Sequence, residues 1–229
     1  MNLPQKGEYI DIHTHDAMHS EGIFAVENLM AHENLKPETI AAGAFTAGIH
    51  PWHLSENNRE QLLEYVRNIA GNPKLIAFGE AGFDKLKGPS IELQKSTFAE
   101  QVRIAGENQK PLVIHCVRSW DELLAAHKDL KPITPWLVHG FRGKKELALQ
   151  LIKRGMYLSF WFDFVLRPES AELLRFLPKE RIFLETDGAD VDIREIYRKV
   201  SDDLEIPIDV LKERIRNNFN LLFNNSNTR

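Results

Sequence analysis

Six side chains of the types that bind metal ions follow short apolar runs spread along the chain. Imidazole nitrogens and carboxylate oxygens are the donors that Zn²⁺, Mn²⁺ and Fe²⁺ prefer. The first two histidines stand two residues apart, and residues i and i+2 of a strand point to the same side, so both can reach one cation. The sequence therefore predicts a metal centre for hydrolysis by a metal-activated water. The six predicted metal ligands are His13, His15, Glu80, His115, His139 and Asp187.

The carboxylates suit catalytic roles in such a centre. A carboxylate has two oxygens and can bridge two cations, which favours Glu80 as a shared ligand, while Asp187 can orient a water molecule and accept its proton. Each residue taken singly has a structural alternative. Glu80 could form an ion pair with Lys74 or Lys85. Asp187 could cap a helix that begins near Val191, and a lone histidine is more often a hydrogen-bonded structural residue. The combination of the six favours the metal site.

Other polar residues near the same runs are candidates for substrate contact. We expect His50 and His53 to line the substrate pocket, and Arg118 to contact phosphate. Further candidates for phosphate contact are Lys85, Lys87 and Arg142, although a solvated loop position is at least as consistent with each of them. Aromatic residues that could stack on bases, but more often fill a core, are Trp136, Phe160, Trp161 and Phe162. Cys116 is interpreted as a small buried residue.

The elements that must position these residues alternate along the chain. Short β-branched runs followed by helical patterns predict βα units and a parallel sheet. Eight runs match the number of strands in a closed barrel, in which strand C-terminal ends share one face. The predicted strands are Tyr9–His13, Ile23–Leu29, Ala44–His50, Leu75–Glu80, Pro111–His115, Trp136–His139, Met156–Ser159 and Ile182–Glu185.

Helices are expected in most of the gaps between the strands. Too few residues lie between His15 and Ile23 for a crossover helix, and only a short helix fits between Leu29 and Ala44. We therefore predict an α/β fold, a distorted TIM-like (β/α)8 barrel with reduced N-terminal crossover helices. The predicted helices are Asn58–Ala70, Ser90–Asn108, Ser119–Lys128, Lys144–Arg154, Pro168–Phe176, Ile193–Leu204 and Ile208–Leu222.

Length and composition indicate one globular domain over residues 1–229. Hydrophobic residues make up 43% and charged residues 27%, the balance of a soluble protein. The single cysteine rules out an intramolecular disulfide, and neither a signal segment nor a long apolar stretch is found, so a cytoplasmic protein without membrane contact is expected. The net charge of −4 excludes a generally basic nucleic-acid surface, so any such contact must be local.

Six ordered motifs together resemble the TatD-type metal-dependent deoxyribonucleases of the amidohydrolase superfamily. The resemblance spans about positions 9 to 222. The motifs are DIHTH (Asp11–His15), GIHPW (Gly48–Trp52), GEAGFD (Gly79–Asp84), VIH (Val113–His115), HGFRG (His139–Gly143) and ETD (Glu185–Asp187).

The resemblance implies residue roles and an activity. One cation would be bound by His13, His15, Glu80 and Asp187, and a second by Glu80, His115 and His139. The activity implied is hydrolysis of DNA phosphodiesters. Departures lie at the substrate rim: Trp52 stands where a second histidine is common, and Arg118 comes one residue later than usual.

The sequence thus predicts a metal-dependent hydrolase with two divalent cations (Zn²⁺, Mg²⁺ or Mn²⁺) that cleaves DNA or a small phosphodiester. No obligate protein partner is indicated. The alternative enzyme is an amidohydrolase that cleaves an amide or lactone of a small molecule with the same ligands, which suits the acidic net charge. A non-enzymatic protein with a structural metal is a further alternative, although Asp187 would then have no evident use.

Overall fold

Eight strands follow one another in the sheet in the order of the sequence. The computed structural model describes residues 3–15, 20–35 and 43–223. The strand order is β1-β2-β3-β4-β5-β6-β7-β8, and the pairs β1–β2, β3–β4, β4–β5 and β7–β8 are parallel. The strands are β1 (Tyr9–Thr14), β2 (Ile23–Met30), β3 (Ala44–Gly48), β4 (Leu75–Asp84), β5 (Leu112–Val117), β6 (Trp136–Val138), β7 (Tyr157–Trp161) and β8 (Ile182–Glu185).

Helices occupy the connections from β3 onward. This parallel order with intervening helices is that of a (β/α)8 barrel and confirms the predicted fold class. The α-helices are α1 (Arg59–Ile69), α2 (Ile91–Glu107), α3 (Trp120–Leu130), α4 (Lys145–Ile152), α5 (Phe162–Val165), α6 (Pro168–Phe176), α7 (Ile193–Leu204) and α8 (Ile208–Phe223). The 3₁₀ turns among the described residues are η1 (Ala31–Glu33), η3 (Pro51–His53) and η4 (Lys179–Arg181).

The first two crossovers are reduced in the described residues, as expected. The described part of the β1–β2 connection contains no helix, and that of the β2–β3 connection contains only the three-residue η1. Residues 16–19 and 36–42, which complete these connections, lie outside the described residues. The helix α5 was not predicted, because its four residues are too few to show a helical period.

The chain divides into two compact units. Among the described residues, unit 1 comprises residues 28–35 and 44–137, and unit 2 comprises residues 3–15, 20–27, 43 and 138–223. The prediction of a single domain over residues 1–229 stays a prediction.

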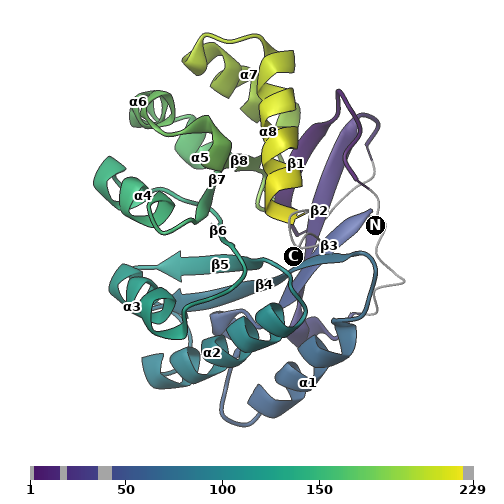
Figure 1. Ribbon diagram of the computed structural model, residues 1–229, viewed down its shortest axis with the longest axis vertical. Coiled ribbons are helices and arrows are strands. Elements are labelled where there is room, and N and C mark those ends of the chain that lie inside the picture. The colour runs from purple at the N-terminus through teal and green to yellow at the C-terminus, as the bar shows by residue number, and fades with distance from the viewer. Residues whose placement is uncertain (1–2, 16–19, 36–42, 224–229) are drawn as a thin grey trace. The chain divides into compact units, whose positions relative to one another are not determined.

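In unit 1, α2 and α3 pack against β4, and α1 packs against β3 and α2 (Figure 1). The N-terminus of α2 is fixed because Ser90 Oγ accepts a hydrogen bond from Leu93 N at 3.3 Å, a typical N-cap. Phe98 on this helix is 1% exposed and packs against Phe83 of β4, with ring centroids 4.7 Å apart. Trp136 is also buried against Phe98, which confirms that this tryptophan belongs to the core.

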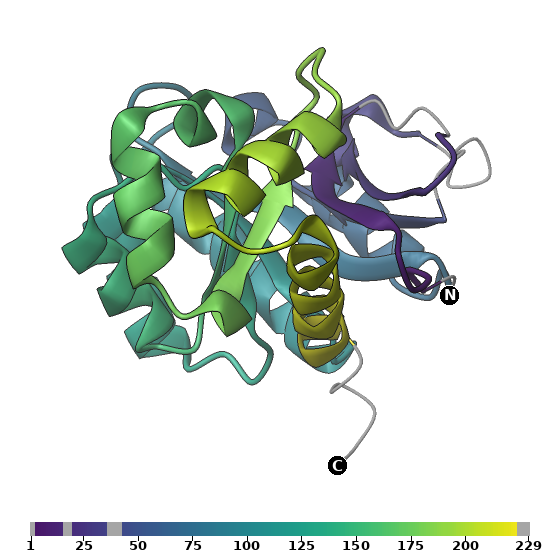
Figure 2. The same ribbon diagram turned by 90° about the horizontal axis from the view of Figure 1, so that it is seen from above.

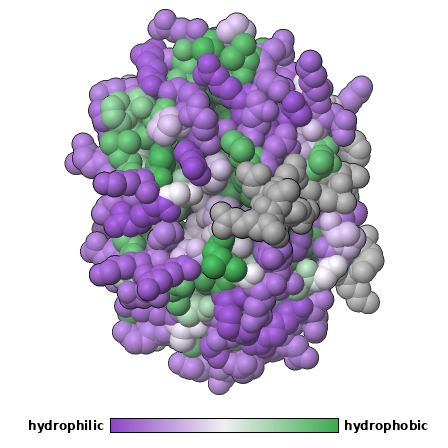
Figure 3. All heavy atoms as spheres, in the orientation of Figure 1, coloured by the Kyte–Doolittle hydropathy of each residue, from purple (hydrophilic) through white to green (hydrophobic). Residues whose placement is uncertain are grey.

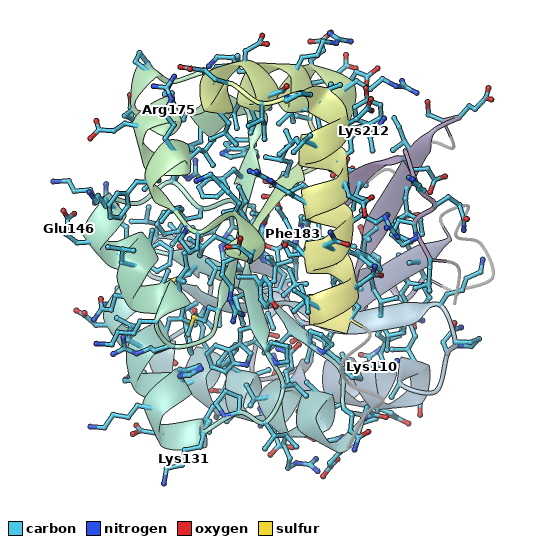
Figure 4. All side chains as sticks on the ribbon, turned by 45° about the horizontal axis from the view of Figure 1, so that its top comes forward. Lys110, Lys131, Glu146, Arg175, Phe183 and Lys212 are labelled. Atoms are coloured by element: carbon cyan, nitrogen blue, oxygen red, sulfur yellow. The ribbon has the colours of Figure 1, made fainter. Side chains whose placement is uncertain are left out.

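In unit 2, α7 leads directly into α8 (Figure 2), and both helices contact β1 and β8. Tyr197 of α7 is buried, and its hydroxyl accepts from Ile10 N and donates to Ile10 O of β1 at 3.2 and 3.1 Å. Phe183 of β8 lies in the interior, whereas Glu146 of α4 and Arg175 of α6 point outward (Figure 4).

The surface seen in Figure 3 is mainly hydrophilic, with separate hydrophobic patches. No helix among the described residues is long and apolar enough to cross a membrane.

Two glycines allow β3 and β4 to approach each other closely in unit 1. A Cβ atom built on Gly48 would lie 2.5 Å from Gly79 Cα and 2.8 Å from Gly79 N. Real Cβ atoms do not approach backbone this closely, so the two strands would have to separate. Gly48 precedes His50 by two residues and Gly79 precedes Glu80 by one, through a cis peptide bond. The close approach therefore sets the positions of two candidate site residues.

We expect Gly48→Ala to lower the free energy of unfolding by about 3 kcal/mol, in the range known for overpacked interiors. Gly71→Ala is the matched control, because a Cβ at that exposed turn would meet nothing within 4 Å. Urea unfolding of both variants measures the difference. Equal stabilities would show that β3 and β4 can separate without cost.

Candidate metal centre

Two buried imidazoles of unit 1 lie beside one carboxylate oxygen. Glu80 Oε1 lies 2.7 Å from His115 Nδ1 and 3.2 Å from His50 Nε2. The two imidazole nitrogens are themselves 3.2 Å apart. One donor atom from each residue lies within 4.8 Å of the others, a spacing that could hold a metal ion. We call His50, Glu80 and His115 the Glu80 cluster.

The side-chain amides of Asn28 and Gln101 hold the backbone at or next to two members of this cluster. Asn28 Oδ1 accepts from Glu80 N and from Thr46 Oγ1, both at 2.9 Å. The amide of Gln101 on α2 bonds both backbone groups of Ile49, accepting from its N–H at 2.7 Å and donating to its carbonyl at 3.2 Å. The Gln101 contact holds the backbone next to His50. Neither Asn28 nor Thr46 was singled out from the sequence, because polar residues within a strand carry no distinctive pattern.

The tautomer of His50 separates its role from that of His115. Trp52 N donates to His50 Nδ1 at 3.1 Å, so a neutral His50 carries its proton on Nε2, which faces Glu80. Such a nitrogen donates a hydrogen bond and has no lone pair for a cation. The geometry therefore suits His50 as a hydrogen-bond donor to Glu80 more than as a metal ligand, although it belongs to the Glu80 cluster.

Asp84 is a further member of this region that the sequence analysis missed. Its Oδ2 accepts from Trp52 Nε1 at 2.6 Å and lies 3.3 Å from His115 Nε2. Its Oδ1 accepts from Leu86 N and Lys87 N at 2.7 and 3.0 Å. Burial raises the pKa of Asp84, but these hydrogen bonds outweigh burial and the net pKa is lowered. Asp84 is therefore ionised at neutral pH and can orient the His115 ring.

Two strands near the Glu80 cluster extend beyond their predicted ends. Strand β4 continues past Glu80 to Asp84, and β5 continues past His115 to Val117. The extension exists because residues 81–84 pair with residues 114–117 of β5. A glycine makes this pairing possible: a Cβ on Gly82 would lie 1.9 Å from His115 O. Glu80 and Asp84 are four residues apart and share one face of this strand, a spacing that indicates a common site only once β4 is known to continue to Asp84.

In unit 2, a second group of side chains surrounds Asp187. Asp187 Oδ1 lies 3.6 Å from His13 Nε2 and 3.5 Å from His15 Nε2, and the two imidazole rings are 5.2 Å apart at 87°. The ring of His139 lies 4.4 Å from that of His13, with Nδ1 4.0 Å from Asp187 Oδ1. We call His13, His15 and Asp187 the Asp187 cluster, whose donor atoms could hold a metal ion.

The Asp187 cluster is open on one side. The His13 side chain is fully buried, whereas those of His15 and Asp187 are 28% and 24% exposed. Asp187 has φ 54° and donates its N–H to His13 O at 3.0 Å, which turns its backbone toward β1. The alternative role of Asp187 as a helix cap was wrong, since Asp192 caps α7 by accepting from Arg194 N.

Two buried carboxylates, Asp11 and Glu185, form hydrogen bonds with residues near the Asp187 cluster. Asp11 accepts from Thr186 N at 3.0 Å and from Thr186 Oγ1 at 2.6 Å, and burial raises the pKa of Asp11 to about 7. Glu185 accepts from Gly140 N and Ser159 Oγ, and its Oε1 lies 3.6 Å from His139 Nδ1. These contacts join the end of β8 to β1, to β7 and to the residues that follow β6.

Of the three predicted substrate residues, His50 and His53 lie near each other, with ring centroids 6.0 Å apart. His53 stacks on His32, with ring centroids 3.6 Å apart, and burial, followed by the His32 charge, lowers the pKa of His53. Arg118 is exposed at the end of β5 with φ 50°. Lys85 pairs with Glu122 at 2.8 Å, so its alternative pairing with Glu80 was wrong. Their roles toward a substrate stay predictions.

The remaining candidates have local partners. The Arg142 guanidinium lies 5.3 Å from the ring centroid of Trp161. Phe160 is fully buried, as expected of a core residue. Cys116 is only partly buried, so its interpretation as a buried residue was wrong. Desolvation nevertheless raises the pKa of its thiol, which disfavours a nucleophilic role.

Comparison with known proteins gives one family. The sequence model described as TatD related DNase matches residues 35–224. A protein of Citrobacter koseri named 3′-5′ ssDNA/RNA exonuclease TatD is 33% identical over 154 residues, which cover 62% of this chain and 56% of that protein. A human protein named 3′-5′ RNA nuclease TATDN2 is 36% identical over 168 residues, 68% of this chain and 21% of that protein. The chain thus spans about half the length of the bacterial relative, and a fifth of the human one.

Solved structures show the same fold. The TatD homologue YJJV of Escherichia coli has a TM-score of 0.79 at 20% identity, covering 96% of this chain and 99% of that chain. A TatD family hydrolase of Entamoeba histolytica has a TM-score of 0.77 at 18% identity, covering 97% and 99%. Both likenesses extend over nearly the whole of each chain, which supports the fold class read from the strand order.

Proposed function

Because the chain belongs to the TatD related DNase family, we propose that it is a metal-dependent hydrolase of nucleic-acid phosphodiester bonds, with single-stranded DNA as its first candidate substrate. The Asp187 cluster carries the proposal. It places two imidazoles within 3.6 Å of one partly exposed carboxylate oxygen, which is a donor set for a divalent cation beside an acid–base group. The names of the two nuclease relatives support the substrate class.

The donors in each unit fit a divalent cation. His13, His15 and Asp187 would hold one in unit 2, and Glu80 with His115 would hold another in unit 1. His115 suits this role because its Nε2 faces Asp84, which leaves Nδ1 beside Glu80. The function of Glu80 as a shared ligand and the assignment of His139 to the second cation stay predictions from the sequence. The donor set does not select among Zn²⁺, Mg²⁺ and Mn²⁺.

When bound, divalent cations stabilise negative charge on the phosphodiester and make water more acidic. In the proposed reaction, the oxygen of water bonds to phosphorus and the phosphorus–oxygen bond to one sugar breaks, its electron pair remaining on the sugar oxygen. Asp187 accepts the proton of the attacking water, since its carboxylate is partly exposed. A second proton, from solvent, completes the leaving sugar hydroxyl.

Residues of unit 1 hold the donor groups of the Glu80 cluster in place. The Nε2–H of His50 lies 3.2 Å from Glu80 Oε1 and donates a hydrogen bond to that buried carboxylate. Asp84, which is ionised, holds His115 by its Nε2. These contacts keep the Glu80 and His115 donor atoms in place before a substrate arrives, which removes a reorganisation cost from the reaction.

The test is digestion of a labelled single-stranded oligodeoxynucleotide by the purified chain with Mn²⁺, Mg²⁺ or Zn²⁺ and with a chelator. Cleavage that needs a divalent cation and stops with the chelator is expected. Parallel reactions contain an RNA of the same sequence and a panel of small amides and lactones. Turnover of the amide or lactone panel without phosphodiester cleavage would replace the proposal by the amidohydrolase alternative.

A further inference from the structure

Trp52 is an exposed aromatic residue beside the Glu80 cluster. Its residue surface is 41% exposed, although its ring lies 4.8 Å from that of His50 and 5.8 Å from that of His115. Tryptophan is enriched at binding hot spots, so an exposed indole beside candidate ligands is a candidate for ligand contact. Trp52 belongs to η3, which begins three residues after the end of β3 and directly after His50.

The indole is held in place by a polar contact. Its Nε1 donates to Asp84 Oδ2 at 2.6 Å, and its backbone N donates to His50 Nδ1 at 3.1 Å. Both partners are buried, 3% exposed each. A ring that is fixed at its polar edge and exposed elsewhere loses little conformational entropy when it stacks on a ligand. The contacts therefore preorganise the ring as a platform.

A lysine ammonium lies over the same ring. Lys87 Nζ is 3.6 Å from the Trp52 ring centroid, and Lys87 N donates to Asp84 Oδ1 at 3.0 Å. One carboxylate thus holds both the indole and the loop that carries the ammonium. An aromatic surface with an adjacent cation is the combination that binds single-stranded nucleic acid, since bases stack and phosphates need positive charge.

We propose that Trp52 and Lys87 form a nucleotide-binding subsite beside the Glu80 cluster, in which the indole stacks on a nucleobase and the ammonium contacts a phosphate. The inference rests on the proposed function and names a specificity determinant for it. A base replaces the ammonium on the indole face, because stacking contributes about 5- to 150-fold in affinity whereas an exposed cation–π contact contributes about 2- to 5-fold. The displaced ammonium then meets the phosphate.

The subsite selects the form of the nucleic acid. Both faces of a base inside a duplex are covered by neighbouring bases, so only an unpaired base can stack on Trp52. The substrate class is therefore single-stranded nucleic acid or a frayed end. Because every base has a π-face, the stacking tolerates any sequence.

The experiment is a binding titration that does not depend on hydrolysis. Fluorescence anisotropy of labelled oligothymidylate, without divalent cation, is measured for the wild-type chain and for Trp52→Leu and Trp52→Phe. Both variants lose the hydrogen bond to Asp84, but only Trp52→Phe keeps an aromatic ring. We expect Trp52→Leu to bind at least about 5-fold more weakly and Trp52→Phe to recover most of that loss. Thermal unfolding verifies that both variants fold.

Two further parts of the experiment test the base contact and the phosphate contact separately. The titration is repeated with an oligonucleotide that contains abasic sites. The ratio of the affinities for oligothymidylate and for the abasic oligonucleotide should be smaller in Trp52→Leu than in the wild type. Lys87→Ala should reduce the salt dependence of log K by about 0.7, the contribution of one phosphate of a single strand. Lys128→Ala on α3 is the matched control, since Lys128 is exposed on a helix surface, and its salt dependence should equal that of the wild type.

The outcomes separate this inference from the proposed function. If Trp52→Leu and Trp52→Phe bind alike, or if the wild type shows no preference for bases, the stacking subsite is overturned whatever the hydrolysis assay shows. An unchanged salt dependence in Lys87→Ala overturns the phosphate contact. Base-dependent binding by a wild-type chain that cleaves no phosphodiester would instead overturn the proposed function and leave the subsite standing.

Discussion

Turnover of single-stranded DNA falls by about 100-fold or more in Asp187→Asn, while substrate binding stays close to that of the wild type. Asparagine has nearly the same shape as aspartate but cannot accept the proton of the attacking water, and loss of a general base costs about 100- to 10,000-fold. Asp187 Oδ1 also lies 3.6 and 3.5 Å from the Nε2 atoms of His13 and His15. Weaker metal binding in the variant would therefore lower turnover further. Steady-state kinetics at saturating Mn²⁺ measures the change.

Asp190→Asn provides the matched control for this variant. Asp190 lies three residues farther along the same loop and is exposed, and the same change of charge there should leave turnover within about twofold, as is usual for surface substitutions. Metal content of both variants is measured alongside, because it separates lost proton transfer from a lost cation. Wild-type turnover in Asp187→Asn would remove this residue from the reaction.

Most of the fold could be predicted because the chain follows simple periodic rules. All eight predicted strands correspond to observed strands, and α6 and α7 have the predicted bounds of Pro168–Phe176 and Ile193–Leu204. Pro at the first position of α6 and Asp192 before α7 are strong start signals. Local patterns of this kind need no knowledge of the rest of the chain.

The strand ends near the Glu80 cluster could not be predicted, because they depend on pairing between distant segments. The run after Glu80 contains glycine and charged residues, which are uncommon in strand interiors. Pairing with β5 nevertheless extends β4 to Asp84, since Gly82 leaves room for the carbonyl of His115. This long-range pairing brings Asp84 to the His115 ring, which explains why the sequence analysis missed Asp84.

The roles of the histidines show a second limit of sequence reasoning. Residue types and spacing selected both His50 and His115, but only a hydrogen bond distinguishes them. Trp52 N donates to His50 Nδ1, which makes Nε2 a proton donor, while His115 Nε2 faces a carboxylate. A tautomer depends on the atom that each ring nitrogen faces, and that information comes only with coordinates.

Glu80→Gln binds fewer divalent cations than the wild-type chain and loses about 1000-fold or more in activity, while the fold survives. Glutamine preserves the volume of Glu80 and its amide oxygen can still accept the hydrogen bond from His50, so the buried cluster keeps its packing. It removes the negative charge, and each 1.36 kcal/mol of lost stabilisation costs tenfold in rate. Metal analysis after dialysis gives the number of cations per chain, and circular dichroism verifies the fold.

The number of cations that Glu80→Gln loses decides how Glu80 functions. Loss of both supports its predicted role as a shared ligand, whereas loss of one restricts it to the Glu80 cluster. Glu107→Gln is the matched control: Glu107 is 57% exposed and pairs with Arg103 on the surface of α2, where an ion pair contributes little. Full metal occupancy in Glu80→Gln, with wild-type occupancy in Glu107→Gln, would show that Glu80 is not a ligand, because a neutral amide in a buried site cannot replace the charge that a divalent cation requires.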